Sequence, residues 1–316
     1  MKHLFIVNPA AGGRDRTAEI EAAAEKILSA RGEPFEVYTT KAPMDAPEKI
    51  AREALENLSL RVYACGGDGT LNECACGAVG RGNVALTSYP TGTGNDFIKI
   101  FGDEAERFRD LPALCAGEVY PLDAVDCNGR CCVNICSVGI DARVGVDVHK
   151  YSRIPLIGGA TGYITSLAVN FFRGITDRLR VKCGDERFEG DMNLICCCNG
   201  GYYGGGFHPV PEARPDDGVL DFLIVKGVSR LAILRVIGGY AKGRYADFPK
   251  LITHRRGGGM EIESEREIVV NVDGEAMYTK RLRLRLLPGA LNFFVPKGLQ
   301  YFAEIKETLN KSPCTP

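Results

Sequence analysis

Gly66-Gly67-Asp68-Gly69-Thr70 is the stretch that decides the fold of this 316-residue chain. It joins the apolar run 62–65, which indicates a buried strand, to a helical pattern over 70–79. Glycine carries no Cβ and tolerates a positive φ, so such a turn lets the main chain approach a ligand closely. The unpaired N–H groups that open the next helix form a natural phosphate site. The alternative is a plain tight turn in which Asp68 caps the helix.

The same alternation of strand and helix extends on both sides of this turn. The pattern predicts strands at 3–7, 35–38, 62–65 and 84–86, and helices at 15–30, 45–58 and 70–79. Such alternation is typical of a parallel sheet covered by helices, which is a Rossmann-like α/β lobe. We assign residues 1–123 to this lobe and expect ligands beyond the carboxyl ends of its strands.

After Pro121 the pattern changes to extended segments separated by Gly, Asn and Asp. It predicts antiparallel strands at 131–136, 179–182, 192–198, 219–225, 268–272, 281–287 and 291–295, and helices near 163–172 and 230–240. The segment 281–286 alternates Arg and Leu, as in a strand with one buried and one wet face. We therefore assign residues 124–295 to a second, antiparallel β-rich sandwich lobe. Residues 296–316 are expected to pack back on the first lobe.

The composition indicates an ordinary folded protein. Hydrophobic residues make up 45% and charged residues 25% of the chain, close to the soluble average. Since the formal net charge is −1, no global field would draw the chain onto nucleic acid or an anionic bilayer. No apolar run approaches the roughly 18 to 20 residues of a membrane span or forms a signal-peptide core. We expect a cytoplasmic protein that binds no nucleic acid, with a homodimer as one candidate oligomeric state.

Cysteine usage points to reduced thiols. There are 13 cysteines, an odd number, and several are neighbours in sequence, such as 131–132 and 196–198. This is a poor framework for paired disulfides. A zinc site is the alternative, but no Cys-x-x-Cys pair occurs, so we interpret these residues as small buried hydrophobes.

Two further turns resemble the first in position. Asn8 to Gly13 and Tyr89 to Phe97 each follow a predicted parallel strand and contain Gly and Pro. The three turns therefore lie at the same edge of the sheet and are expected to form one site. No Gly-Lys-Ser/Thr follows the glycines, which excludes a Walker loop. Their spacing is not that of the dinucleotide-binding fingerprint, which excludes a site of that class as well.

These residues carry a resemblance to the diacylglycerol kinase-like lipid kinases, a family that includes sphingosine kinases and bacterial lipid kinases. In the first lobe the matching segments are Asn8-Pro9-x-x-Gly12, Gly66-Gly67-Asp68-Gly69-Thr70-x-Asn72-Glu73 and Pro90-x-Gly92-Thr93-x-Asn95-Asp96-Phe97. In the second they are Gly139-Ile140-Asp141-Ala142-x-Val144, Gly204-Gly205-Gly206 with Pro209, Pro215-Asp216-Asp217-Gly218-x-Leu220-Asp221, and Val272-Asp273-Gly274-Glu275. The resemblance covers nearly the whole chain. Gly-Gly-Asp-Gly-Thr alone also occurs in NAD kinases and phosphofructokinases.

The resemblance implies a cradle for the phosphates of ATP. Its residues would be Asn8, Pro9, Ala10, Ala11, Gly12, Thr40, Gly66, Gly67, Asp68, Gly69, Thr70, Leu71, Asn72 and Thr93. Thr39 is an equal choice for the position given to Thr40. Ala11 departs from the Ser that this family often has, which removes a hydroxyl contact to phosphate but not the loop.

The resemblance also implies a base and a metal site. Asp273 and Glu275 follow the strand 268–272, and one of them would accept the proton of the acceptor alcohol, although Asp-Gly is also a common hairpin turn. Asp217, with the main-chain carbonyls of Arg214 and Val219, resembles a site for Mg²⁺, which oxygen ligands suit. A cation is also expected because Asp68 would otherwise repel phosphate, and Asp68 and Asp96 are expected to reach it through water. The alternative for 215–218 is a plain turn.

The sequence features that would bind the lipid acceptor or the membrane are less specific than those of the ATP loops. Between Arg230 and Arg256 there are seven basic residues and one acid, Asp247. Such a patch would dock on anionic membrane headgroups, or it is a solvated helix face. The glycine-rich segment 199–207, with Tyr202 and Tyr203, is either a lip over an acyl-chain cleft or a surface loop.

The sequence therefore predicts an ATP-dependent, Mg²⁺-requiring lipid kinase at the membrane surface. Diacylglycerol is the first choice of acceptor, and sphingoid bases, ceramide, phosphatidylglycerol and other lipid alcohols stay open. One alternative is a kinase of a soluble acceptor such as NAD. The other is a nucleotide-sensing protein without turnover.

Overall fold

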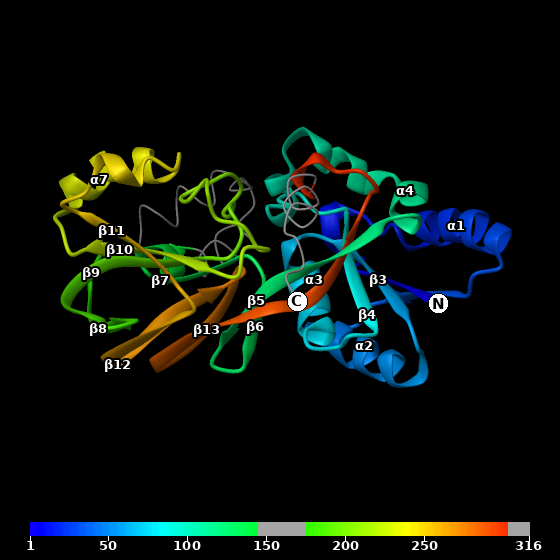
Figure 1. Cartoon of the computed structure of the whole chain (residues 1–316), viewed down its shortest axis with the longest axis horizontal. Helices are drawn as coiled ribbons and strands as arrows, with labels where there is room; N and C mark the ends of the chain where they lie inside the picture. Colours follow the sequence, from blue (N-terminus) through cyan, green and yellow to red (C-terminus); the bar gives the residue numbers. More distant parts are fainter. Residues whose placement is uncertain (145–174, 303–316) are drawn as a thin grey trace, which may run out of the picture. The chain divides into compact units, whose positions relative to one another are not determined.

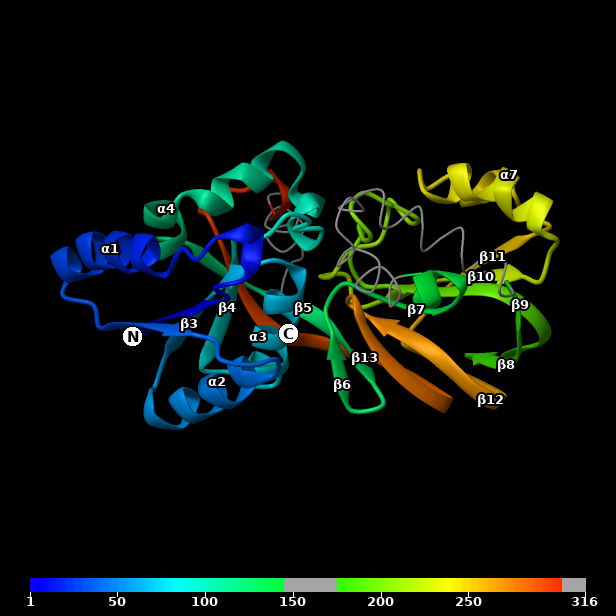
Figure 2. The same ribbon diagram turned by 180° about the vertical axis from the view of Figure 1, so that it is seen from behind.

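The computed structural model of the chain describes residues 1–144 and 175–302 and is drawn in Figures 1 and 2. It divides into two compact units. Unit 1 comprises Met1–Pro121 and Leu291–Pro316, and unit 2 comprises Leu122–Ala290. The helix expected near 163–172 lies outside the described residues. Among the helices within them, none is long and apolar enough to cross a membrane.

Unit 1 is built on a parallel sheet with the strand order β2-β1-β3-β4-β13. The strands are β1 (Lys2–Val7), β2 (Phe35–Thr39), β3 (Leu60–Gly66), β4 (Val84–Pro90) and the end of β13 (Glu275–Val295). β1 and β3 are buried along nearly their whole length, because helices cover both faces of the sheet.

The helices of unit 1 follow the strands in alternation. They are α1 (Thr17–Leu28), α2 (Asp45–Glu56), α3 (Asp68–Ala78) and α4 (Leu111–Cys115), with 3₁₀ segments at Ala11–Gly13, Ser29–Arg31 and Phe97–Arg109. α1 and α4 lie on one face of the sheet, and α2 and α3 on the other (Figures 1 and 2). The α/β lobe expected from the alternating pattern is confirmed.

The described end of the chain packs within unit 1. A 3₁₀ turn at Gln300–Phe302 buries Phe302, whose ring stacks on Tyr120 with centroids 3.9 Å apart. Tyr301 meets the ring of Phe101 edge-on at 5.1 Å. These aromatic contacts tie residues 300–302 to the first lobe.

Unit 2 is antiparallel and β-rich. Its strands are β5 (Glu118–Cys127), β6 (Arg130–Cys132), β7 (Ile135–Gly139), β8 (Asp177–Cys183), β9 (Glu186–Cys198), β10 (Leu220–Lys226), β11 (Ile252–Gly257), β12 (Gly259–Val272) and most of β13. The order is β11-β10-β9-β7-β12-β13, with β8 paired to β9 and β12 and β5 paired to β13 and β6. Helix α7 (Arg230–Tyr240), a helical segment at 140–144 and a 3₁₀ turn at Tyr245–Asp247 complete its described residues.

Two apolar clusters hold unit 2 together. Successive side chains of a strand point to opposite faces, so Phe222 of β10 packs in one cluster and Leu223 in the other. The neighbouring cysteines follow the same rule, with Cys197 on the first face and Cys196 on the second. All described cysteines are free and most are buried, as small hydrophobic residues would be.

The structure corrects three details of the predicted strands. The single strand expected at 131–136 is broken into β6 and β7 around Val133 and Asn134. The two strands expected at 281–287 and 291–295 are one continuous strand, β13. β5 and β11 were not predicted, because β5 carries acidic and polar residues and β11 is rich in Arg.

Candidate active site

Three loops of unit 1 leave the carboxyl ends of β1, β3 and β4 and contact one another. The side-chain amide of Asn8 donates from Nδ2 to Oγ1 of Thr70 at 3.2 Å. The main-chain N–H groups of Thr91 and Gly92 both donate to the carbonyl oxygen of Gly66, at 3.0 and 3.1 Å. The structure therefore brings together the three loops that their positions along a parallel sheet predicted.

Close approach of main chain requires glycine at two of these contacts. A Cβ at Gly12 would lie 2.2 Å from the carbonyl oxygen of Thr91, and Gly12 also has a φ of 64°. A Cβ at Gly92 would lie 2.5 Å from Cα of Gly67. Each distance is shorter than any side chain accommodates, so the loops fit together only with glycine there.

None of the three glycines of the turn itself has a positive φ, and only Gly66 is needed for space, which corrects part of the sequence argument. Gly66, Gly67 and Gly69 are all outside the left-handed region. A Cβ at Gly66 would lie 2.1 Å from Oγ1 of Thr70. At Gly69, which is exposed in the first turn of α3, a Cβ would meet no atom of the chain within 4 Å. The start of α3 is thus open at Gly69.

Asp68 does not cap α3. The N-cap residue is Gly67, without a side-chain capping bond, and Asp68 is the first residue of the helix. Its Oδ1 instead accepts the main-chain N–H of Phe97 at 3.1 Å, which links the β3 loop to the β4 loop. An acid in the first turn is compatible with the positive end of the helix dipole. Leu71 donates its N–H to Gly67 within the helix at 3.0 Å, and Asn72 is buried.

The first loop is held by its own turn. Oδ1 of Asn8 accepts the N–H of Ala10 at 3.0 Å, and the carbonyl of Asn8 accepts the N–H of Ala11 at 3.1 Å. Pro9 is partly exposed between them. The side-chain amide of Asn8 therefore connects its own loop to Thr70.

Thr40 and Thr93 lie at the same edge. Thr40 follows β2 and donates both its N–H, at 2.9 Å, and its hydroxyl, at 3.3 Å, to the carbonyl of Val7. The hydroxyl of Thr39 meets that of Thr17 at 3.2 Å. Thr93 is exposed in the β4 loop. Thr39, the last residue of β2, is thus bonded to Thr17 of α1, and Thr40, just after the strand, is bonded to Val7 of β1.

Asp273 of unit 2 is anchored by main chain. Its Oδ2 accepts the N–H of Val133 at 2.7 Å, and its Oδ1 accepts those of Asn134 and Ile135 at 3.1 and 2.8 Å. Cys132 also lies 3.2 Å from Oδ1. These bonds satisfy the N–H groups at the break between β6 and β7. The backbone of Asp273 has a φ of 49°, which Asp tolerates better than most residues.

Glu275 differs from Asp273 in its exposure and in its hydrogen bonds. It is exposed at the start of β13. Within 1–144 and 175–302, its side chain makes no hydrogen bond or ion pair. The geometry therefore separates a fixed carboxylate from a solvated one, a distinction that the shared Asp-Gly-Glu segment does not reveal.

The residues predicted to bind metal lie in the turn before β10. Oδ1 of Asp217 accepts the N–H of Val219 at 3.1 Å, and Oδ2 accepts from Nη2 of Arg256 at 2.5 Å. Arg214 instead pairs with Asp216, Nε to Oδ1 at 3.1 Å. In the part of the chain that the structure describes, no three His, Cys, Asp or Glu side chains are grouped to hold a metal. A Mg²⁺ ion here would therefore depend on Asp217, main-chain carbonyls and water, which are oxygen donors of the right kind.

Asp123 is a residue that sequence reasoning missed. It is buried, and its carboxylate accepts the N–H of Gly218 at 2.8 Å and of Gly289 at 2.7 Å. Its own N–H donates to the carbonyl of Pro215 at 2.6 Å. Burial raises the pKa of Asp123, and the two N–H donors oppose that rise. The only hint was an acid inside the apolar run 122–125.

A second buried acid network adjoins Asp217. Oδ1 of Asp221 lies 2.6 Å from Nε2 of His254 and 3.2 Å from Nε of Arg256. Asp221 is fully buried, and burial raises its pKa while His254 and Arg256 lower it. Arg256 therefore bridges Asp217 and Asp221.

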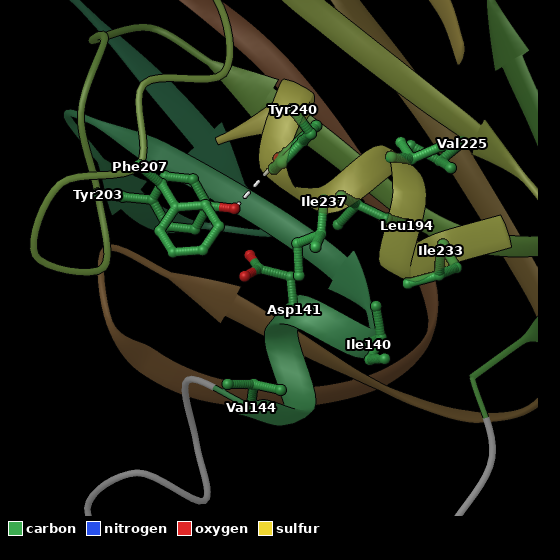
Figure 3. Close-up of a pocket in the computed structure, with 11 residues that line it drawn as sticks. Ile140, Asp141, Val144, Leu194, Tyr203, Phe207, Val225, Ile233, Ile237 and Tyr240 are labelled. Atoms are coloured by element: carbon green, nitrogen blue, oxygen red, sulfur yellow. Dashed lines mark hydrogen bonds between the residues drawn. The ribbon is translucent and has the colours of Figure 1, made fainter. Parts of the chain in front are cut away.

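Unit 2 also contains an apolar pocket (Figure 3). α7, β9, β10, the segment that begins at Ile140 and the loop 203–207 surround it. Its lining residues are Ile140, Asp141, Val144, Leu194, Tyr203, Phe207, Val225, Ile233, Val236, Ile237 and Tyr240. The glycine-rich segment predicted as either a lip or a surface loop thus contributes Tyr203 and Phe207, while Tyr202 stacks on His208 at 3.8 Å. The pocket suits a hydrocarbon chain.

Asp141 is the one acid among the described residues that line this pocket. Its Oδ2 accepts the hydroxyl of Ser137 at 2.8 Å, and the hydroxyls of Tyr203 and Tyr240 are 3.1 Å apart. Burial raises the pKa of Asp141 to about 6, although hydrogen bonds from Ser137 and Tyr203 lower it. Figure 3 shows its carboxylate projecting among the apolar side chains. The pocket is therefore largely apolar, with the carboxylate of Asp141 and the hydroxyls of Tyr203 and Tyr240 as polar groups in its lining.

The fold and these loops define a kinase of the diacylglycerol kinase class. The diacylglycerol kinase catalytic domain matches residues 2–127, and the YegS C-terminal NAD kinase beta sandwich-like domain matches residues 134–295. The chain belongs to this diacylglycerol kinase-like family of lipid kinases, which confirms the resemblance drawn from its motifs.

Relatives and solved structures agree. A Pseudomonas aeruginosa protein named "Probable lipid kinase YegS-like" is 31% identical over 94% of this chain and 95% of its own. A protein of the same name from Stenotrophomonas maltophilia is 30% identical over 85% of this chain and 89% of its own. A crystal structure of a "putative diacylglycerol kinase" from Bacillus anthracis is 25% identical, with a TM-score of 0.72 over 94% of this chain and 98% of that one. The fold of both lobes is thus shared with a solved structure.

Proposed function

We propose that this lipid kinase phosphorylates diacylglycerol with ATP, giving phosphatidic acid. The pocket of unit 2 is the observation that carries the proposal, because it is lined by hydrocarbon side chains from α7 and the strands beneath it. A hydrocarbon lining suits acyl chains and disfavours a charged, soluble acceptor such as NAD. Membership of a kinase family implies ATP as phosphoryl donor.

The donor side of the proposal uses the loops of unit 1. Phosphoryl transfer needs a cradle that positions the phosphates and offsets their charge. The exposed first turn of α3 supplies N–H groups and the positive end of a helix dipole. Gly69 leaves that turn open, since a Cβ there would meet no atom of the chain within 4 Å. Asn8, Thr70 and the β4 loop hold the cradle in shape through the contacts described above.

We propose that Asp273 accepts the proton of the lipid hydroxyl that is phosphorylated. Its three main-chain donors fix the carboxylate in one orientation. Such a carboxylate is a weak base, but a weak base suffices when the transition state of phosphoryl transfer is loose, because the alcohol loses its proton late. Glu275 is solvated nearby in sequence and takes a supporting electrostatic role in this proposal.

Magnesium completes the proposal. When bound, Mg²⁺ offsets negative charge that the phosphates carry. Asp217 would hold it together with the main-chain carbonyls of Arg214 and Val219. Arg256, which donates to Oδ2 of Asp217, then competes with the cation for that oxygen.

A lipid assay tests the proposal. The full chain is incubated with radiolabelled ATP and a total lipid extract, and the labelled product is identified by mass. We expect labelled phosphatidic acid, and about a hundredfold less or lower still with Asp273→Asn. Labelled NADP from NAD, without any labelled lipid, would support the soluble-acceptor alternative. ATP binding without any labelled product would support a nucleotide sensor.

A further inference from the structure

Helix α7 has two faces of different character. Ile233, Val236 and Tyr240 are buried and line the pocket. On the opposite side, Leu231 is 74% and Leu234 is 56% exposed. An exposed leucine by itself is ordinary, but two adjacent ones on one helix face form an apolar patch.

Two exposed basic residues accompany these leucines, Arg235 next to Leu234 in the helix and Lys242 just after its end. Arg235 and Lys242 are exposed and form no ion pair with any residue of 1–144 or 175–302. The sequence has no acid between Asp221 and Asp247. The outer face of α7, by which we mean Leu231, Leu234 and Arg235 of the helix and Lys242 two residues beyond its end, therefore combines exposed apolar side chains with exposed basic ones.

The structure reduces the number of basic residues in the stretch from Arg230 to Arg256 that can bind an external partner. Arg255 forms a bidentate pair with Glu186, at 2.6 and 2.9 Å. Arg256 is engaged by Asp217 and Asp221. These two arginines are committed to acids of unit 2, so the surface charge available to a partner comes from α7 and the residues that follow it.

We propose that the outer face of α7 docks on an anionic lipid bilayer. An interfacial helix buries Leu among the acyl chains and keeps Arg and Lys at the headgroups, and α7 presents this combination. Anionic lipids complement its single sign of charge. The inference rests on the proposed function in one respect, since the inner face of the same helix lines the pocket given to the lipid. Docking would then place the pocket next to the bilayer from which its substrate comes.

Vesicle sedimentation tests the docking face without ATP or turnover. The full chain is mixed with phosphatidylcholine vesicles with and without phosphatidylserine. We expect binding to require phosphatidylserine. Arg235→Glu with Lys242→Glu should weaken it about 25-fold or more, since each basic residue near an anionic surface contributes about fivefold. Leu231→Ser with Leu234→Ser should weaken it about tenfold, because buried leucines are lost from the contact.

A matched pair provides the control. Leu55 and Leu58 are 85% and 100% exposed in unit 1, and changing both to Ser should leave vesicle binding unchanged. Parent-like binding by the charge-reversed variant, or equal losses for both leucine pairs, would overturn the proposal. The proposed function is judged separately by activity on a short-chain acceptor dispersed in detergent. A chain that docks through α7 but phosphorylates no lipid would disprove that function and leave the docking face standing.

Discussion

The carboxylate of Asp273 accepts the main-chain N–H of Ile135 at 2.8 Å, while the N–H of Asp273 donates to the carbonyl of Ile135 at 3.0 Å. The two residues thus bond reciprocally across two chain segments far apart in sequence. The same carboxylate also satisfies Val133 and Asn134. The side chain of Asp273 therefore accepts the N–H groups at the break that follows β6. The same bonds hold its carboxylate in a fixed position at the turn after β12.

The first prediction separates the two roles of this carboxylate. Asp273→Asn should lower kcat about 10² to 10⁴-fold with ATP affinity nearly unchanged, because the side chain acts on the acceptor hydroxyl. It should also lower the free energy of unfolding by about 1 to 3 kcal/mol, since an amide nitrogen cannot accept from the N–H groups it faces. Steady-state kinetics and urea unfolding measure the two effects. Glu275→Gln should retain the parent stability. A normal kcat for Asp273→Asn would transfer the base role to Glu275.

The second prediction concerns the open first turn of α3. Gly69→Ala should preserve or raise the free energy of unfolding by up to about 1 kcal/mol, because alanine favours helix and its Cβ meets no atom of the chain. The same Cβ should weaken ATP binding if phosphate lies against that turn. Isothermal titration with ATP and thermal unfolding check both. Gly82→Ala, also without a neighbour within 4 Å but before β4, should leave ATP affinity unchanged. Equal ATP affinity in all three proteins would contradict the cradle.

Local patterns predicted most elements of this fold but not β5 and β11, and long-range contacts decided where some strands break or continue. The helix expected at 230–240 is α7, residue for residue, because a helix depends on spacing within itself. The break at Val133 and Asn134 depends on Asp273, which no local pattern contains. The predicted strands 281–287 and 291–295 left a break between them, yet Gly289 gives its N–H to Asp123 and β13 continues through it.

The candidate site also contains features that were predictable from local sequence and features that were not. The three loops at one edge of the sheet were predictable, since parallel strands end together. The pocket was not, because Asp141, Tyr203 and Tyr240 come from three separate segments. Asp123 was missed for a similar reason, since its partners lie at Gly218 and Gly289.

The third prediction sets two variants against each other at the turn before β10. Asp217→Asn should raise the Mg²⁺ concentration needed for half-maximal activity, because it removes the charged oxygen ligand. Arg256→Ala should lower it, since the guanidinium no longer competes for Oδ2 of Asp217. Mg²⁺ titrations of ATP-dependent activity measure both shifts. Arg256→Ala should also cost about 1 to 3 kcal/mol of stability, because Asp221 is buried and keeps only His254. An unchanged Mg²⁺ requirement for Asp217→Asn would exclude Asp217 as a ligand, and a raised one for Arg256→Ala would exclude the competition.

The last prediction concerns the acid in the pocket. Burial raises the pKa of Asp141 to about 6, from 3.8 in the unfolded chain, so the folded protein binds the extra proton between these values. The stability gained from neutral Asp141 is therefore fully present below about pH 4 and is lost as the pH rises through about 6. The full loss is about 3 kcal/mol, at roughly 1.4 kcal/mol for each pKa unit. We expect the free energy of unfolding of Asp141→Asn to lack this decline, and that of Asp185→Asn, at an exposed position in the turn after β8, to keep it. Urea unfolding at a series of pH values measures the slopes, and equal slopes for the parent and Asp141→Asn would show that the pocket leaves this carboxyl solvated.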